Sequence, residues 1–181
     1  MKPRQQLAYQ LLEWVGTDRL QLIQVATGWP SHFKCQTEEG QVALAAHLGK
    51  IVLSKRKRDY VERRFQNPGQ GKPVLADTGE FPILLGFDEA KGKRVLVGMD
   101  GVKRLNKVTR QSLFFPVSLL AAGIAKGWAE HESTVNERIV AFVPPLLPFF
   151  VDVYREKRTV TTKEIRAALK SAGVKSLPPE A

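Results

Sequence analysis

The sequence contains few of the residues that build disulfides and metal centres. It has one cysteine, Cys35, and three scattered histidines, His32, His47 and His131. A single cysteine cannot form an internal disulfide, and these four residues lack the paired spacing of a zinc site. We therefore expect no metal and no cofactor, and we expect the protein to work in the reducing environment of the cytoplasm.

Long apolar runs and nucleotide-binding motifs are missing as well. No apolar stretch approaches the roughly 20 residues that a membrane-spanning helix needs. Residues 1–6 lead into an amphipathic segment instead of the apolar core of a signal peptide. The sequence also has no glycine-rich phosphate loop and no histidine-based nuclease cluster. These absences argue against a membrane partner and make binding a better first hypothesis than catalysis. We expect any catalytic centre of the system to lie on another domain or subunit.

The chain is instead rich in positive charge, with 28 Lys and Arg against 18 Asp and Glu and a formal net charge of +10. Six of the cations fall within ten residues: Lys55, Arg56, Lys57, Arg58, Arg63 and Arg64. Clustered cations neutralise phosphates, and Arg can bind phosphate oxygens through two hydrogen bonds. The run therefore predicts a contact with nucleic acid, most readily double-stranded DNA. The alternative is a solvated loop whose cations pair with Asp59 and Glu62.

The spacing within this run limits how many of its cations can face one ligand. If residues 60–65 form a strand, Arg63 and Arg64 point to opposite faces, because side chains alternate along a strand. One of these two arginines is then expected to be structural.

A second basic element lies in a polar loop over residues 101–110. Its candidate DNA contacts are Lys103, Arg104, Asn106, Lys107 and Arg110. Asparagine can bind the edge of adenine through two hydrogen bonds. In a turn, however, asparagine is more often present because its backbone tolerates the left-handed conformation. The cations of this loop are therefore the stronger prediction.

Trp29, His32 and Phe33 form a third candidate, a pocket for an extruded base. Aromatic side chains in a loop can stack on a base that has been flipped out of the duplex, as proteins that recognise modified bases require. The alternative is that Trp29 and Phe33 cap the hydrophobic core, which is the commoner role of large aromatics.

The order Asp77, then Glu89-Ala90-Lys91, raises an enzymatic alternative. A class of magnesium-dependent nucleases uses this order, with two carboxylates on the metal and a lysine that assists attack by water. In that class the Glu-x-Lys segment lies within a strand, whereas residues 88–93 have the composition of a turn. A magnesium-dependent nuclease is therefore the weakest alternative.

The patterns of the chain predict an α+β fold with a central, mostly antiparallel sheet, curled toward a barrel, and flanking helices. Helical spacing and capping residues predict helices over residues 5–15, 116–127, 145–154 and 161–173. Apolar runs between turns predict strands at 20–25, 42–53, 73–75, 81–87, 94–99, 112–115, 128–132 and 138–143, with a loop at 27–33. We expect residues 1–154 to form a single α+β recognition domain and residues 155–181 a charged helix and tail.

Several segments carry a resemblance to a known group of proteins. They are RDYVERRFQNPG (58–69), FPILLGFD (81–88), VLVGMD (95–100), SLFFP (112–116), GWAE (127–130) and RIVAF (138–142). With them, the region from about residue 40 to residue 154 resembles the accessory domains encoded with DNA methyltransferases and restriction endonucleases in bacterial defence loci. The basic residues 55–58 depart from that resemblance, because the corresponding segment is shorter and less basic in the group.

This resemblance implies a DNA-binding recognition module of a bacterial restriction-modification or phage-defence system. Such a module would recognise a target sequence or a base modification and would work with a restriction endonuclease or methyltransferase subunit. The alternative is a protein-docking subunit of the same kind of system, which would bind its partner through the apolar helix around 146–151 and the basic face. Salt distinguishes the two, because only DNA binding should weaken steeply as salt rises.

Overall fold

The structure is a computed structural model, and it describes residues 1–26, 28–66, 68, 71–108 and 111–175. Its strands are β1 (Leu20–Gln24), β2 (Ser31–Thr37), β3 (Gly40–Leu53), β4 (Glu62–Phe65), β5 (Phe81–Ala90), β6 (Lys93–Asp100), β7 (Phe114–Pro116), β8 (Trp128–Glu132) and β9 (Arg138–Phe142). Its helices are α1 (Pro3–Val15), α2 (Val117–Lys126), α3 (Leu147–Glu156) and α4 (Thr162–Ser171), with short 3-10 turns η1 (Val102–Arg104) and η2 (Pro144–Leu146).

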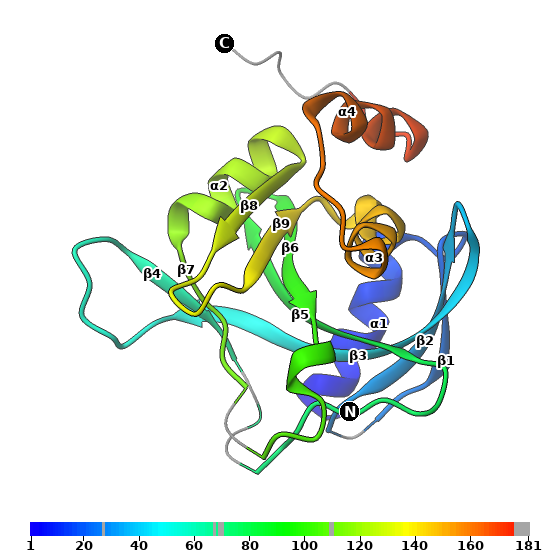
Figure 1. The fold of residues 1–181 in the computed structure, drawn as a ribbon, viewed down its shortest axis with the longest axis horizontal. Helices are drawn as coiled ribbons and strands as arrows, with labels where there is room; N and C mark the ends of the chain where they lie inside the picture. The colour runs from blue at the N-terminus through cyan, green and yellow to red at the C-terminus, as the bar shows by residue number, and fades with distance from the viewer. Residues whose placement is uncertain (27, 67, 69–70, 109–110, 176–181) are drawn as a thin grey trace.

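The strands form one mixed sheet in the order β1-β2-β3-β5-β6-β9-β8 (Figure 1). Neighbouring strands pair antiparallel except for β3 and β5, which run parallel. Over the residues that the structure describes, the sheet ends at β1 and β8 and does not close into a barrel. The prediction of an α+β fold with a mostly antiparallel sheet is confirmed. The sheet, which was expected to curl toward a barrel, remains open.

The long strand β3 connects the main sheet to a smaller ribbon. Its first part pairs with β2 on one edge and with β5 on the other, while residues 51–53 pair with β4. Strand β4 also pairs with β7, which leads directly into α2. Residues 42 and 44–49 of β3 are buried, which explains the alanines that made this segment ambiguous between helix and strand. The prediction of strand over this segment is confirmed.

Helices pack on the sheet through apolar faces. Helix α1 buries Leu7, Leu11 and Trp14, and the ring of Trp14 lies 5.2 Å from that of Phe87 on β5. Helix α3 contributes Phe150, whose ring stacks on Phe142 of β9 at 4.7 Å. Both helices were expected from the helical spacing of their apolar residues. No helix in the described part of the chain is long and apolar enough to cross a membrane.

Three local predictions differ from the structure. The expected loop at 27–33 is shorter, because β2 begins at Ser31 and makes His32 and Phe33 strand residues. The expected strand at 73–75 is reduced to one bridge between Val74 and Leu105. The strand expected at 112–115 begins two residues later, at Phe114. The last two differences depend on pairing with segments distant in the sequence, β4 for β7 and Leu105 for Val74, and local composition does not encode such pairing.

Helix α4 lies outermost, beside α3 (Figure 1). The hydroxyl of Thr161 accepts a hydrogen bond from the amide of Glu164 at 3.2 Å, as the capping residues predicted. The helix packs on the body through Leu169, which is 7% exposed, and Arg19 donates a 2.7 Å hydrogen bond to the carbonyl of Ala172. Helix α3 continues past residue 154 and ends at Glu156. The division of the chain into a domain and a tail at residue 154 stays a prediction.

Candidate nucleic-acid interface

The first basic run lies on a projecting hairpin that we call the arm, residues 51–65. The end of β3 pairs with β4 in the register Ile51 with Phe65 and Leu53 with Arg63. The connection between these strands, residues 54–61, extends away from the rest of the body (Figure 1). All six cations of the run are therefore carried by one two-stranded element.

Glu62 is the centre of a buried ion pair at the base of this connection. It is 3% exposed, and its two carboxylate oxygens accept hydrogen bonds from Nε and Nη2 of Arg56, each at 2.8 Å. The hydroxyl of Ser54 donates to the same carboxylate at 2.6 Å, and Arg58 lies 3.5 Å from it. Hydrogen bonding from Arg56 lowers the pKa of Glu62 to about 2, although burial acts in the opposite direction. Arg56 and Arg58 therefore stabilise the loop.

The other four cations of the arm form no ion pair within the described ranges: Lys55, Lys57, Arg63 and Arg64. Lys55 and Lys57 are exposed in the connection, whereas Arg63 and Arg64 are half-buried in β4. Arg63 pairs with Phe115 and Arg64 with Phe114 across to β7, so these adjacent arginines lie on opposite faces, as the strand period predicted.

Apolar side chains are exposed on the same arm. Leu53 is 61% exposed, Tyr60 46% and Val61 53%. Beside the lysines they form a mixed basic and apolar surface on the projecting part of the molecule. A surface of this kind can contact phosphates and bases together, or it can pack against a protein.

The second basic element is divided between structural and exposed residues. The guanidinium of Arg104 pairs with Glu137, with Nε donating at 3.0 Å, and this pair is largely buried. Asn106 has a left-handed backbone with φ of 62°, which explains asparagine at this position, and its amide donates to the carbonyl of Val74 at 2.8 Å. Lys103 and Lys107 are exposed. Arg110 lies outside the described residues.

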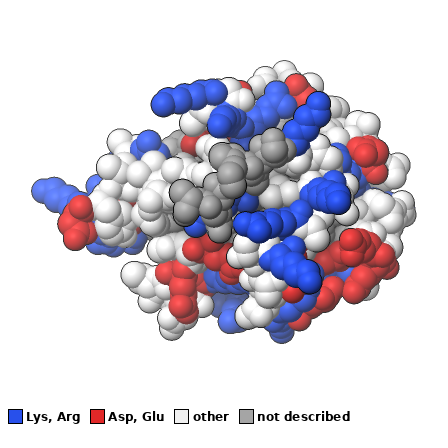
Figure 2. Space-filling model, turned by 90° about the horizontal axis from the view of Figure 1, so that it is seen from above, with Lys and Arg blue, Asp and Glu red and all other residues white. Residues whose placement is uncertain are grey.

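The structure does not bring the two basic elements into one patch. The turn η1 lies away from the projecting connection of the arm (Figure 1). Seen from above, Lys and Arg side chains occupy several parts of the surface, with Asp and Glu side chains among them (Figure 2). Any contact with DNA that uses both elements would therefore have to span separate parts of the molecule.

The three residues of the predicted base pocket are also separated. Phe33 is 1% exposed and lies in the core. The indole of Trp29 stacks on Phe65 with ring centres 5.9 Å apart, and its Nε1 donates to the carbonyl of Pro73 at 3.1 Å. His32 extends from β2 toward Glu80. The packing of Trp29 and Phe33 is what the core-capping alternative described.

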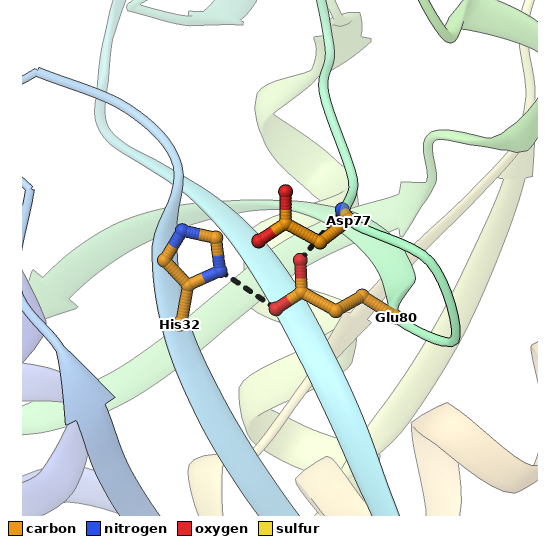
Figure 3. Close-up of side chains that lie close together, drawn as sticks. All are labelled: His32, Asp77 and Glu80. Atoms are coloured by element: carbon orange, nitrogen blue, oxygen red, sulfur yellow. Dashed lines mark hydrogen bonds and ion pairs between the residues drawn. The ribbon is translucent and has the colours of Figure 1, made fainter.

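His32, Asp77 and Glu80 form a cluster that the sequence analysis did not predict (Figure 3). One oxygen of Glu80 lies 2.6 Å from Nδ1 of His32, and the other accepts a 2.8 Å hydrogen bond from the backbone amide of Asp77. Both oxygens of Glu80 are thus already bonded, and the cluster ties β2 to the turn before β5. The sequence analysis considered Asp77 and His32 in separate hypotheses, and no local pattern indicated that they lie together.

The residues of the possible magnesium-dependent nuclease site do not lie together in the structure. Asp77 lies in the turn that precedes β5, whereas Glu89 and Lys91 lie at the far end of β5 and in the turn after it. Strand β5 is ten residues long, which separates its ends by roughly 30 Å at the usual rise per residue. A single metal ion cannot contact carboxylates at both ends.

The apolar helix proposed for protein docking is part of the core. Leu146 is 1% exposed, and Leu147, Phe150 and Val151 are fully buried. The prediction that this helix presents an apolar docking surface is therefore wrong. Its apolar residues pack against the sheet, as the apolar face of an amphipathic helix usually does.

His47 is a buried histidine on β3 that sequence analysis left unassigned. Its Nδ1 donates to the carbonyl of Ile83 at 3.0 Å, and its Nε2 accepts from the amide of Leu75 at 3.1 Å. Burial lowers the pKa of His47 to about 4. The neutral imidazole thus joins β3 and β5 to the segment before β5, which is a structural role.

Comparison with known proteins places this chain in a family. A family model described as methylase-associated X1 matches residues 23–151, more than two thirds of the sequence. The chain belongs to the methylase-associated X1 family. The match confirms the expected resemblance to methylase-associated accessory domains, and the matched region includes the arm and η1 but not α1 or α4. No curated protein and no solved structure matches the chain.

Proposed function

We propose that this domain is the DNA-contacting accessory module of a methyltransferase-containing restriction-modification or phage-defence system. Membership of the methylase-associated X1 family supports the link to a methyltransferase. The observation that carries the DNA contact is the arm, which projects from the body and exposes Lys55 and Lys57 beside Tyr60.

The shape of the arm suits a groove of duplex DNA. The major groove is about 12 Å wide and admits a two-stranded ribbon. In this arrangement Lys55 and Lys57 would neutralise phosphates, while Tyr60 and Val61 would contact sugars or base edges. Because the Arg56–Glu62 pair already fixes the start of the connection, binding would order little additional backbone, and less free energy would be lost on association.

The exposed cations near η1 are proposed as a second, weaker contact. Lys103 and Lys107 have no ion pair within the described ranges and could reach phosphates of the same duplex or of a bent one. Arg104 is committed to Glu137, so we assign it to the structure of the loop. Base contacts are assigned to the arm because Phe33 is buried and Trp29 is packed on Phe65.

The test is a fluorescence-polarisation titration with one duplex in unmodified, cytosine-methylated and adenine-methylated forms, each at low and near-physiological salt. We expect binding that weakens steeply as salt rises, because phosphate contacts release counterions. Tighter binding to one form would show recognition of that modification, and equal binding would direct the search to sequence. An absence of binding to all forms at low salt would contradict the proposal.

The exposed apolar residues of the arm support a second candidate, a protein-docking subunit. Leu53, Tyr60 and Val61 could pack against a methyltransferase or nuclease partner. Such a complex should persist as salt rises, and the free domain should show little affinity for DNA. The same titration, repeated with the partner present, separates the two candidates.

A further inference from the structure

A groove on the other side of the molecule has a charge opposite to that of the whole chain. It lies between α4, α3 and the β2–β3 turn and has a volume of about 550 Å³. Its charged lining residues are the acids Glu38, Glu39, Asp152, Glu156 and Glu164 and the bases Arg19 and Arg158. A local excess of carboxylates on a protein of net charge +10 favours a cationic ligand.

Three of these carboxylates converge. Glu39, Asp152 and Glu156 each offer an oxygen, and the three oxygens lie within 4.8 Å of one another. Asp152 and Glu156 stand one turn apart on α3, on the same face of the helix. Glu39 is placed by the β2–β3 turn, in which the hydroxyl of Thr37 accepts from the amide of Glu39 at 3.2 Å and donates to the carbonyl of Gly40 at 2.8 Å.

One oxygen of this cluster is buried and unsatisfied. Asp152 is 6% exposed; its carboxyl interacts with the Thr37 side chain and the Glu38 backbone, but across the described part of the chain its Oδ1 has no hydrogen-bond partner. Leaving a buried acceptor unpaired is destabilising, and more so when the group is charged, so such an atom requires an explanation. Like charges at i and i+4 of a helix add repulsion between Asp152 and Glu156. A bound cation would remove both penalties.

We infer that Glu39, Asp152 and Glu156 form a binding site for a divalent cation that prefers oxygen ligands, such as Ca²⁺ or Mn²⁺. Oxygens on opposite sides of a Ca²⁺ ion lie roughly 4.6–5.2 Å apart, because each is 2.3–2.6 Å from the ion, so three oxygens at the observed spacing can contact one ion. The ligand set contains no nitrogen or sulfur, which disfavours zinc.

The surroundings are compatible with such an ion. Arg158 donates a 2.9 Å hydrogen bond to Oε2 of Glu156, which leaves the other oxygen of that carboxylate for the ion. The same arginine bonds Glu164 of α4 at 2.6 Å. The ion would join the β2–β3 turn to α3 at the floor of the groove and would stabilise the folded state by an amount that rises with the logarithm of its concentration above the dissociation constant. This site is separate from the arm and does not depend on the proposed DNA contact.

The test is a titration of the full chain with Mn²⁺. Binding is measured as the loss of the electron paramagnetic resonance signal of the free ion. We expect one bound Mn²⁺ that Ca²⁺ displaces, and a rise in the melting temperature on addition of either ion. Asp152→Asn and Glu39→Gln should each weaken binding by about tenfold or more, since affinity follows the number of charged ligands. Glu39 is exposed, so its substitution should not impair folding.

Asp77→Asn is the matched control, because it removes one carboxylate from the cluster with His32 and Glu80 and should leave Mn²⁺ binding unchanged. Three outcomes would overturn the inference. These are an absence of binding at millimolar Mn²⁺, binding that survives both Asp152→Asn and Glu39→Gln, and binding that only Asp77→Asn removes.

Discussion

Arg56 and Glu62 form an ion pair through two parallel hydrogen bonds, each 2.8 Å long. The guanidinium of Arg56 also lies 3.7 Å from the ring centre of Phe114 on β7. This arrangement anchors the first turn of the arm to the β4–β7 ribbon. It separates the basic run into cations that hold the loop and cations that are available to a ligand, a distinction that charge density alone cannot make.

Replacing Arg56 should destabilise the protein. In Arg56→Ala the buried carboxylate of Glu62 keeps Ser54 and the more distant Tyr60 hydroxyl and Arg58, so we expect a loss of about 1–3 kcal/mol in the free energy of unfolding by urea. The partly exposed position of Arg56 places this below the loss for a fully buried pair. Lys57→Ala is the control and should change stability by less than about 0.5 kcal/mol. Equal effects of the two substitutions would contradict the structural role of Arg56.

The lysines of the arm should affect DNA binding and leave stability unchanged. In the double variant Lys55→Ala, Lys57→Ala we expect weaker binding to every duplex, with the slope of log K against log salt reduced by about two units. Lys34→Ala with Lys93→Ala removes the same charge from exposed positions in the main sheet and serves as the control. If both pairs reduce the slope alike, net charge and not the arm determines binding.

Stability should depend on pH through His47. Its ordinary pKa of 6.5 applies in the unfolded chain and falls to about 4 in the folded protein, so the unfolded state binds more protons between these values. Stability therefore rises with pH over this window and is lost as the pH falls through it, by on the order of 3 kcal/mol at the low end.

Urea unfolding at neutral pH and at pH 4 measures this dependence. His47→Gln removes the titrating group and should flatten that part of the curve, whatever its effect on overall stability. A curve for His47→Gln that parallels the parent would show that carboxylates such as Glu62 account for the whole effect.

Gly98 should not tolerate a side chain. A Cβ at this position would lie 2.2 Å from the carbonyl oxygen of Leu84 and 2.8 Å from Cδ2 of Leu85, in the paired strands β5 and β6. Because the backbone oxygen cannot move without breaking the pairing, Gly98→Ala should lower the unfolding free energy by about 3 kcal/mol. Gly28→Ala is the control, since nothing lies within 4 Å of its added Cβ. A Gly98→Ala melting temperature equal to that of the control would be inconsistent with this packing.

The sequence predicted elements whose pattern is local. Thr161 and Gly173 marked the ends of α4, and Gly127 has the left-handed backbone expected at the end of α2. The strands predicted at 128–132 and 138–143 pair as the β8–β9 hairpin, and Asn136 between them has φ of 61°. These signals need only neighbouring residues, because capping and turn preferences act over a few positions.

What the sequence did not reveal depends on long-range pairing. Nothing near Arg104 indicates that Glu137 neutralises it, and nothing near Asp152 indicates that Glu39 lies beside it. The basic run was visible as a cluster of charge, but the bond between Arg56 and Glu62 depends on the turn that β3 and β4 impose. Local charge thus locates a surface, whereas the fold determines which of its cations are free.

The parallel pairing of β3 with β5 determines when β3 can be completed during protein synthesis. One edge of β3 can pair with β2 as soon as it is made, but Leu44–Lys50 obtain their second neighbour only after residues 81–87 have left the ribosome. An apolar strand with an open edge is a template for pairing with other chains. While residues 44–50 are outside the ribosome and residues 81–87 are not, the nascent chain therefore exposes this edge and is prone to aggregate.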